Sequence, residues 1–455
     1  MSGYDFSKDN NISGLWKLYL IMALIAGSIL VFLTPVYEVP DEANHFYRAW
    51  QISEGSFLSP AVKNQEDGKI YLTAFYPKVF SSNETDTGNF DDIKSFLNTP
   101  VNYESITSSE ISNTGAYTPL GYFPQALICF IARLLNCNAG VIFYAMRFAA
   151  LIFAVVCVCL SMRLLPEQNL LIFLIGIMPM FMFECASISC DPIIYGVCFL
   201  SAAYLFYLAK SENEIKPVQI FALITIALSI GLLKQIYGTI LLLYFFIPYQ
   251  RFKTKTKFFA FGLFLMALCI AVSLLWLHIS VKQFNAELAI LEGVADFQRQ
   301  KDFIFSEPGR FIQILFTSRI KTFTADIARF IGILGRLNVI LARWFYPVYA
   351  LLLLFAAFTI KIRLGFFQRV IMIFGVMASI FAMDIFFYLT WTAVESNIIF
   401  GFQGRYLIPL SLLIFPVISC GSGLKNRTQF YTALTAGIIS ISVTLYGIFN
   451  FYYEW

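Results

Sequence analysis

Charged residues are scarce in this chain of 455 residues, because Asp, Glu, Lys and Arg together make up only 13% of it. Soluble domains contain about 25%. Only two histidines occur, and none of the nine cysteines falls in the polar stretch of residues 37–117. The cysteines lie in or beside apolar segments, which is typical of small buried side chains rather than of a disulfide framework. A net charge of +4 gives no sign of nucleic-acid binding. These absences exclude a water-soluble globule and a disulfide-stapled secreted domain.

Hydrophobic residues make up 58% of the chain, and the mean hydropathy is +0.71. Apolar runs long enough to cross ~30 Å of hydrocarbon recur along most of the sequence. The composition therefore predicts an all-α polytopic membrane protein with about eleven transmembrane helices. The predicted spans are Leu15–Pro35, Gly140–Arg163, Leu170–Cys185, Pro192–Lys210, Val218–Leu233, Tyr237–Tyr249, Phe258–Ser280, Trp344–Ile360, Phe367–Leu389, Tyr406–Cys420 and Phe430–Asn450.

The segment Pro119–Leu135 decides the topology, since it is apolar but short and contains Pro124 and Arg133. If it does not cross and the N-terminus is cytoplasmic, most of the basic connections, including the four-charge run of residues 251–257, face the cytoplasm. If it crosses, that run faces outward, against the positive-inside rule. We therefore expect Pro119–Leu135 to be a juxtamembrane helix at the outer interface, with the N-terminus inside and the C-terminus outside.

Five units follow from this topology. They are the N-terminus with the first span (1–36), a large extracytoplasmic loop with the juxtamembrane helix (37–139), spans two to seven (140–280), a second outer loop (281–343) and spans eight to eleven (344–455). Residues 37–117 contain twelve Asp or Glu against five Lys or Arg. The second loop mixes bases with Phe, Ile and Leu, which predicts amphipathic helices on an anionic surface or a cradle for a lipid phosphate.

The first outer loop opens with an unusual group of side chains. If Pro40 begins a helix, Asp41, His45 and Arg48 fall at i, i+4 and i+7 and share one face. Acids at the start of a helix, here Asp41 and Glu42, favour its positive end, so local capping and pairing with His45 and Arg48 explain the pattern without any function. A carboxylate beside an imidazole and a guanidinium can also act as a general base.

Further polar groups gather at the predicted outer ends of the spans. Ionisable residues at membrane depth are candidates for function because their burial is costly, although snorkelling and capping explain many of them one by one. Their shared placement on the outer face is the stronger signal. They are Glu184 and Asp191 around a Cys- and Ser-containing turn, Lys234 with Gln235 between two spans, and Gln403, Arg405 and Tyr406 before the tenth span.

Four motifs together resemble a known family of multi-spanning bacterial membrane proteins of unknown function, the DUF2142-like proteins, which is grouped with the GT-C glycosyltransferases. The resemblance covers residues 15–450. The motifs are Pro40-Asp41-Glu42 with His45 and Arg48-Ala49, Tyr117-Thr118-Pro119-Leu120-Gly121-Tyr122, Ala186-Ser187 with Ser189 and Asp191, and Gln403-Gly404-Arg405-Tyr406 with Pro409. The chain departs from the pattern at Lys234–Tyr237, where a proline-containing turn is expected, and at Gly335–Asn338. The second departure weakens any inference about an acceptor at that loop.

The resemblance implies a GT-C-like fold and a polyprenyl-phosphate sugar donor used at the extracytoplasmic face of a bacterial inner membrane. It places the catalytic carboxylate at Asp41, with Glu42 as a substitute. In the mechanism that we expect, His45 orients Asp41 or contacts the acceptor. The leaving phosphate needs positive charge to hold it, and we expect Arg405, where an outer loop enters a span, or alternatively Lys234 or Arg48, to supply that charge. Tyr117, Asp191, Gln403 and Tyr406 would line the substrate site.

The expected reaction is inverting transfer of a sugar, with glucose as one candidate, to a cell-envelope glycan such as lipid-linked O-antigen. No cofactor is expected, and no metal either, because no Asp-x-Asp occurs in the first loop. The expected partners are the lipid-linked donor, the glycan acceptor and the bilayer, with the protein a monomer or weak oligomer. Three alternatives stay open: a flippase for lipid-linked glycan, an O-antigen polymerase, and a structural subunit.

Overall fold

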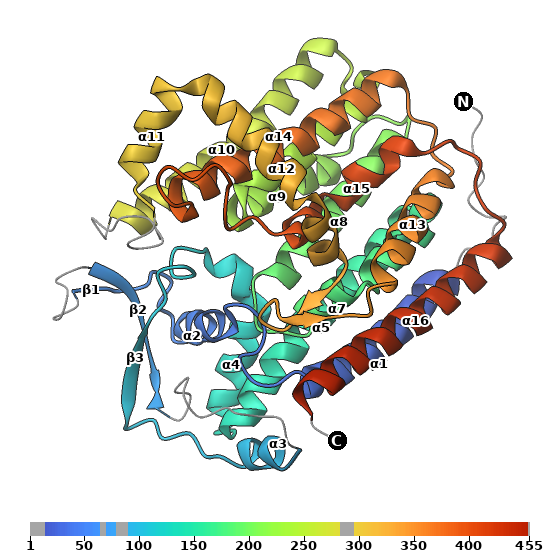
Figure 1. The fold of residues 1–455 in the computed structure, drawn as a ribbon. Helices are drawn as coiled ribbons and strands as arrows, with labels where there is room; N and C mark the ends of the chain where they lie inside the picture. Colours follow the sequence, from blue (N-terminus) through green and yellow to red (C-terminus); the bar gives the residue numbers. More distant parts are fainter. Residues whose placement is uncertain (1–13, 64–69, 79–89, 283–294, 454–455) are drawn as a thin grey trace.

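The computed structural model describes residues 14–63, 70–78, 90–282 and 295–453. Within these residues, six helices are long and apolar enough to cross a membrane. They are α1 (Leu15–Leu33), α5 (Ala139–Leu164), α8 (Asp191–Ala209), α10 (Lys255–Lys282), α14 (Phe366–Trp391) and α16 (Asn426–Tyr452). Each coincides with a predicted span. The chain is a mostly helical membrane protein (Figure 1).

The predicted span Leu170–Cys185 is interrupted. It consists of α6 (Asn169–Gly176), preceded by the short turn η4 (Pro166–Gln168), and α7 (Pro179–Cys185), and the two arms meet at 75°. Pro179 explains the break, because proline lacks a backbone N–H and pushes the preceding residue into an extended conformation. Met178 indeed has φ −62° and ψ 140°. The sequence pattern alone predicted one continuous helix here.

The remaining predicted spans are shorter apolar helices. Proline, glycine and mixed 3-10 geometry shorten several of them. They are α9 (Pro217–Leu233), η5 (Gln235–Phe246) with η6 (Tyr249–Phe252), α13 (Phe345–Phe358), and η7 (Gly404–Leu410) with α15 (Ser411–Ile414) and η8 (Phe415–Ile418). The segment at Pro119–Leu135 forms η3 (Pro119–Tyr122) and α4 (Phe123–Leu134).

The first outer loop folds into a small unit that we call the first-loop domain. It comprises α2 (Glu42–Ser53), β1 (Ala61–Lys63), β2 (Ile70–Pro77), α3 (Phe90–Leu97) and β3 (Ile106–Glu110). The strands form an antiparallel sheet in the order β1-β2-β3, which the all-helical expectation missed. Leu72, Ala74 and Tyr76 alternate along β2 and are buried, and Tyr76 stacks on Tyr47 of α2 with ring centroids 3.9 Å apart.

The second outer loop supplies α11 (Phe297–Ser306), α12 (Pro308–Ile331) and a hairpin of β4 (Ile333–Leu334) and β5 (Val339–Ile340). Part of this loop and part of the first lie outside the described residues, as do the first 13 residues of the expected N-terminal unit.

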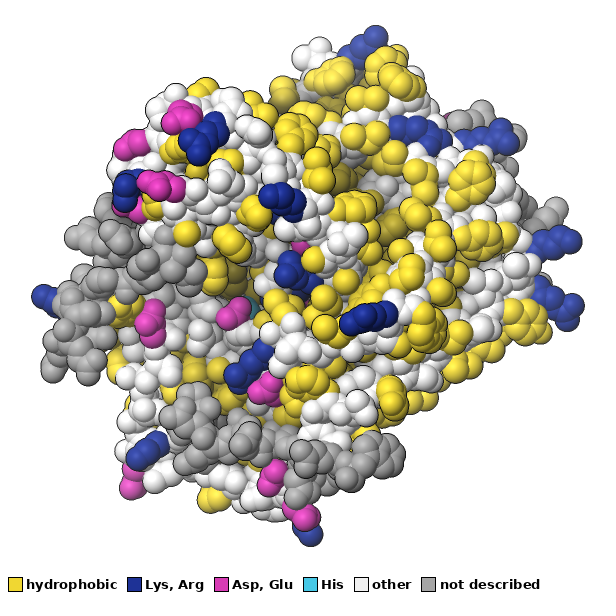
Figure 2. All heavy atoms as spheres, viewed as in Figure 1, with side chains coloured by type: hydrophobic (Ala, Val, Ile, Leu, Met, Phe, Trp, Pro, Cys, Tyr) yellow, Lys and Arg dark blue, Asp and Glu magenta, His cyan; other side chains and the backbone are white. Residues whose placement is uncertain are grey.

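The spans differ in how deeply they are buried. In α8, 72% of the most apolar stretch is buried, against 28% in α10 and in α14, so α8 is central and the other two are peripheral. Helices α1 and α16 lie side by side along one edge of the body (Figure 1). On the face shown in Figure 2, the right-hand rim carries Lys and Arg without Asp or Glu, whereas the acidic side chains lie toward the left and the bottom.

Candidate functional site

Asp41 lies immediately before α2 rather than in it. Its backbone has φ 59°, the left-handed region that Asp tolerates better than most residues. The helix therefore starts at Glu42 rather than at Pro40, and Asp41 takes the cap position before it, where its carbonyl oxygen accepts a hydrogen bond of 3.0 Å from the His45 N–H. The Asp41 side chain is exposed, and its Oδ1 accepts a hydrogen bond of 3.0 Å from Asn113 Nδ2. Asn113 is itself held by Asn44, whose Nδ2 donates to Asn113 Oδ1 at 2.7 Å. The carboxylate is thus fixed in place and open to solvent.

Glu42 has a different environment. It forms a fully buried ion pair with Arg147 of α5, with Arg147 Nη2 at 2.6 Å from Oε2 and Nε at 2.8 Å from Oε1. The backbone N–H groups of Tyr37 and Ile188 also donate to this carboxylate, at 3.1 and 3.0 Å. Glu42 therefore ties the first-loop domain to α5 and to the turn before α8. These four bonds occupy both carboxylate oxygens of Glu42.

His45 is buried against two tyrosines. Its Nδ1 lies 2.6 Å from the Tyr122 hydroxyl, and its ring stacks on Tyr117 with centroids 6.2 Å apart. Burial lowers the pKa of His45 from its ordinary value of 6.5 to about 4. The imidazole is therefore neutral at pH 7 and can hold or receive a hydrogen bond but does not supply a positive charge.

Arg48 is completely buried and points into the first-loop domain. Its guanidinium donates to the carbonyls of Phe57 and Tyr117 at 2.6 and 3.0 Å and to Gln51 Oε1 at 2.8 Å. Burial lowers the pKa of Arg48 to about 10, which still leaves it positive at pH 7. Because these acceptors occupy Nη1 and Nη2, Arg48 holds the loop in shape, and its geometry does not suit the predicted contact with a donor phosphate.

Lys234 is the cation with the fewest partners in this region. It lies in the extended break between α9 and η5, with φ −162° and ψ 102°. Its Nζ lies 5.8 Å from the centre of the Tyr117 ring and 5.1 Å from that of Tyr406. Within the described residues its ammonium group forms no ion pair and no hydrogen bond, and the residue is only partly exposed. A half-buried ammonium against two aromatic faces is well suited to receive an anion.

Arg405, by contrast, is neutralised. It opens η7, where its Nη1 pairs with Glu184 of α7 and lies 3.9 Å from Asp191 Oδ2 at the start of α8. Several buried polar atoms around this pair find no partner within the described part of the chain. They are Arg405 Nε, Glu184 Oε2, the Tyr195 hydroxyl and Gln403 Oε1. Unpaired buried polar atoms in one place indicate room for water or a polar ligand.

These groups form one cluster, which we call the outer-end site. The charges of Asp41, Asp191, Arg405 and Lys234 all act on His45, so the imidazole lies among them. Tyr117 bridges His45 and Lys234, and Tyr406 bridges Lys234 and Arg405, whose guanidinium lies 5.5 Å from its ring centre. Four segments far apart in the sequence therefore meet at one place, and we name the site for the outer helix ends at which the sequence predicts them. Figure 2 shows the surface hollowed where the first-loop domain meets the helical body.

The comparisons with known proteins identify the family of the chain. A family described as predicted membrane proteins, DUF2142, matches residues 24–414. The chain belongs to the DUF2142 family. The matched region contains every residue of the outer-end site. No curated protein and no solved structure matches the chain.

Several residues that shape the outer-end site are not distinguished by the sequence alone. Asn113 follows β3 in a polar turn and carries no distinctive signal. Tyr122 ends the Tyr117–Tyr122 motif, but its contact with His45 depends on the fold. Arg147 offered the best clue, since an arginine in the middle of an apolar run is costly unless it is paired. The described residues contain no group of His, Cys, Asp and Glu side chains that could hold a metal ion.

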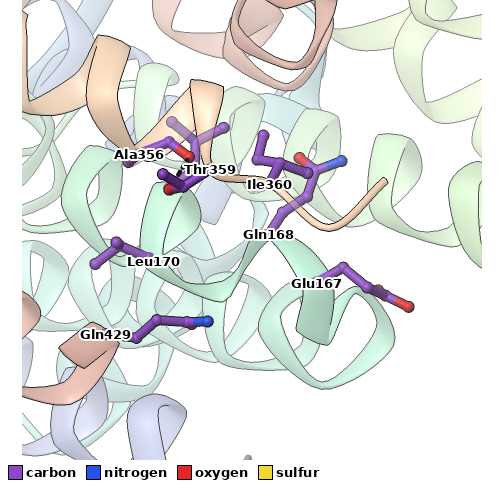
Figure 3. A pocket seen from close by; sticks show the side chains of 8 residues that line it. Glu167, Gln168, Leu170, Ala356, Thr359, Ile360 and Gln429 are labelled. Carbon is purple, nitrogen blue, oxygen red and sulfur yellow. Dashed lines mark hydrogen bonds between the residues drawn. The ribbon is translucent and has the colours of Figure 1, made fainter. Parts of the chain in front are cut away.

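A separate small pocket lies where η4 and α6 meet the end of α13 (Figure 3). It is lined by Glu167, Gln168, Leu170, Leu171, Ala356, Thr359, Ile360 and Gln429. Gln168 is buried there with neither side-chain polar atom bonded to a described residue, which suits an ordered water. None of the outer-end site residues lines this pocket.

Proposed function

We propose that the protein is an inverting, metal-independent GT-C-type glycosyltransferase. It would transfer a sugar, with glucose as one candidate, from a polyprenyl-phosphate donor to an extracytoplasmic glycan such as lipid-linked O-antigen. The observation that carries the proposal is that an open, hydrogen-bonded carboxylate, Asp41, and a half-buried ammonium without an ion pair among the described residues, Lys234, both lie near His45 in one site. A base and an anion-binding cation in one site are the two groups that this transfer needs.

In the proposed reaction, an acceptor hydroxyl oxygen attacks the anomeric carbon of the donor while Asp41 takes the hydroxyl proton. The bond from the anomeric carbon to the phosphate oxygen breaks, and its electron pair leaves with the polyprenyl phosphate. The transition state resembles an oxocarbenium ion. Lys234 holds the departing phosphate. Neutral His45, anchored by Tyr122, can hydrogen-bond a sugar hydroxyl without repelling the cationic transition state.

The proposed location is a bacterial inner membrane, with eleven spans and the outer-end site on the extracytoplasmic face. Two observations support this orientation. First, the rim at the right of Figure 2, away from the first-loop domain, carries Lys and Arg without Asp or Glu on the face shown, as the positive-inside rule requires of a cytoplasmic side. Second, both ends of the η3–α4 segment contact α2, through Tyr122 with His45 and through Arg133, which lies 3.1 Å from Glu54. A segment that stays beside α2 at both ends supports the proposed interfacial position of Pro119–Leu135.

A binding experiment tests the phosphate site first. Wild type, Lys234→Gln and the control Lys253→Gln are purified, and undecaprenyl phosphate binding is measured, with inorganic phosphate as competitor. Lys253 is 67% exposed and pairs only with Glu214 at 3.4 Å. We expect Lys234→Gln to weaken binding by roughly 30-fold, about 2 kcal/mol, because a buried charged contact is lost. Unchanged affinity in Lys234→Gln refutes the phosphate site. Competition by inorganic phosphate alone indicates that the headgroup, not the chain, is recognised.

A second experiment tests transfer. Cells that lack the protein receive wild type or Asp41→Asn, and their surface glycans are compared by mass spectrometry. General-base catalysis contributes about 100-fold or more, so Asp41→Asn should bind undecaprenyl phosphate normally and lose the added sugar. An Asp41→Asn protein that inserts normally and transfers fully contradicts the mechanism. A water-filled path with no bound lipid instead favours the flippase, and loss of polymer length rather than of a side sugar favours the O-antigen polymerase.

A further inference from the structure

Helix α12 of the second outer loop exposes a continuous apolar stripe. Ile312, Phe316, Ile320 and Phe323 are 50, 63, 77 and 62% exposed. Their spacing of four, four and three residues places them on one face of the helix. The opposite face is buried, where Phe311, Ile314 and Leu315 pack with Tyr388 and Ile399. The stripe therefore points away from the protein, and no described residue covers it.

The contacts of α12 along its length show how it lies. Near its start, Phe311 packs on Tyr388 at the end of α14, with ring centroids 4.9 Å apart. In its middle, Ser318 Oγ accepts a hydrogen bond of 2.9 Å from the backbone N–H of Ile399. Beyond its end, Arg336 pairs with Glu38, directly after α1, at 3.2 Å. Every one of these partners belongs to the outer end of a span or to an outer connection. The helix, about 36 Å long for 24 residues, thus runs across the outer ends instead of along a span.

The polar side of α12 also excludes a transmembrane position. Arg319 pairs with Asp326 at 3.1 Å and with Asp384 of α14 at 3.4 Å, and it stacks 3.9 Å from the centre of the Phe402 ring. Helix α12 also packs closely on the segment that carries Arg405. The two backbones approach so closely there that a Cβ on Gly404 would lie 1.8 Å from the Asp326 carbonyl oxygen. The charges of Arg319 and Asp326 are thus held by ion pairs, while the large apolar groups of the stripe are left exposed, a combination that suits an interfacial helix.

We propose that α12 lies in the outer membrane interface with its stripe inserted among the acyl chains of the outer leaflet. The partner is lipid. Because α12 packs on the segment that carries Arg405, the helix holds this part of the outer-end site at the membrane boundary. Arg310 and Lys321 on the same helix are exposed basic residues, which complements anionic headgroups. Trp344, 55% exposed at the start of α13, adds an aromatic side chain of the kind enriched at membrane interfaces. The inference does not depend on glycosyl transfer.

Site-directed spin labelling tests this placement in the full-length protein. Of the nine cysteines, only Cys137 and Cys420 are not buried, so their replacement by serine gives a background with low labelling. Phe316→Cys is labelled with a nitroxide and reconstituted into vesicles of phosphatidylethanolamine and phosphatidylglycerol. Collisions with oxygen, which partitions into lipid, are compared with collisions with a water-soluble nickel chelate. Phe374→Cys on α14 is the lipid reference and Glu104→Cys in the first loop is the water reference, since both positions are exposed.

We expect the label at position 316 to favour oxygen, at a depth of about 5–10 Å, shallower than position 374. Accessibility to the nickel chelate equal to that of position 104 overturns the proposal, because the stripe then faces water. Low accessibility to both reagents overturns it as well, because a second copy of the chain or another protein then covers the stripe. Each labelled protein is first required to unfold at the same detergent concentration as the unlabelled background.

Discussion

The buried ion pair of Glu42 and Arg147 offers a quantitative test of how the site is held. Both side chains are completely buried, and the guanidinium donates two bonds to the carboxylate. Arg147 also donates to the carbonyls of Val31, Thr34 and Pro35 at 2.7–3.0 Å, where α1 ends. Removing the charge of one partner leaves the other charge buried and uncompensated, which costs about 3–5 kcal/mol. We therefore expect Glu42→Gln to lower the free energy of unfolding by that amount.

The assay is unfolding by sodium dodecyl sulfate in mixed micelles, followed by circular dichroism. Arg147→Met should cost at least as much, because it also strands the three carbonyls at the end of α1. The double variant should cost less than the sum of the two, since neither charge is then left alone. The control is Glu214→Gln, which breaks the exposed pair with Lys253 and should change stability by less than about 1 kcal/mol. Wild-type stability in Glu42→Gln, with activity lost, refutes this reasoning and makes Glu42 a catalytic group.

Two further predictions concern His45 and Gly404. Because the folded pKa of His45, about 4, lies below its ordinary 6.5, the unfolded chain binds the proton first, and stability is lost as pH falls from 6.5 to 4. His45→Gln should remove roughly 3 kcal/mol of that loss, measured as the difference in unfolding free energy between pH 7 and pH 4. Gly404→Ala should destabilise the protein by about 1–3 kcal/mol, because its new Cβ would overlap the α12 backbone, whereas Gly365→Ala, with 3.7 Å to its nearest neighbour, should not.

Two results would contradict these predictions for His45 and Gly404. If wild type and His45→Gln lose the same stability between pH 7 and pH 4, His45 is not buried as a neutral imidazole. If Gly404→Ala and Gly365→Ala unfold at the same detergent concentration, the close approach of η7 to α12 is not a constraint.

The sequence predicted the helical elements well because a bilayer imposes a simple requirement on them. A segment in hydrocarbon must be apolar and must satisfy its own backbone, so apolar runs translate directly into helices. The apolar runs did not reveal where a span is interrupted or where its helix type changes. Pro179 splits one predicted helix into α6 and α7, and η5 is a 3-10 helix of 12 residues. The sheet of the first-loop domain was also missed, although residues 70–76 are rich in the aromatic and β-branched residues that favour strands.

The site could be located from the sequence, but the roles of its residues could not be ranked. Placement at outer helix ends and the family resemblance together selected the segments that meet in the structure. Which cation is free depends on partners from distant segments: Glu184 of α7 neutralises Arg405, and the carbonyls of the first-loop domain occupy Arg48. These partners lie at sequence separations of up to 221 residues, and no local pattern encodes them. Only the fold shows that Lys234 is the available cation.

The balance of charge in the outer-end site yields the last prediction. The buried and half-buried groups comprise two cations, Arg405 and Lys234, and two carboxylates, Glu184 and Asp191. An anionic headgroup that enters this neutral set meets repulsion from Asp191, which lies 3.9 Å from Arg405 without a close hydrogen bond to it. Asp191→Asn removes that repulsion at constant shape, so undecaprenyl phosphate should bind more tightly, by roughly tenfold for about 1.4 kcal/mol. Lys234→Gln in the same background should cancel the gain. Weaker binding by Asp191→Asn would mean that the carboxylate accepts a hydrogen bond from the ligand, and the phosphate would then have to lie away from Arg405.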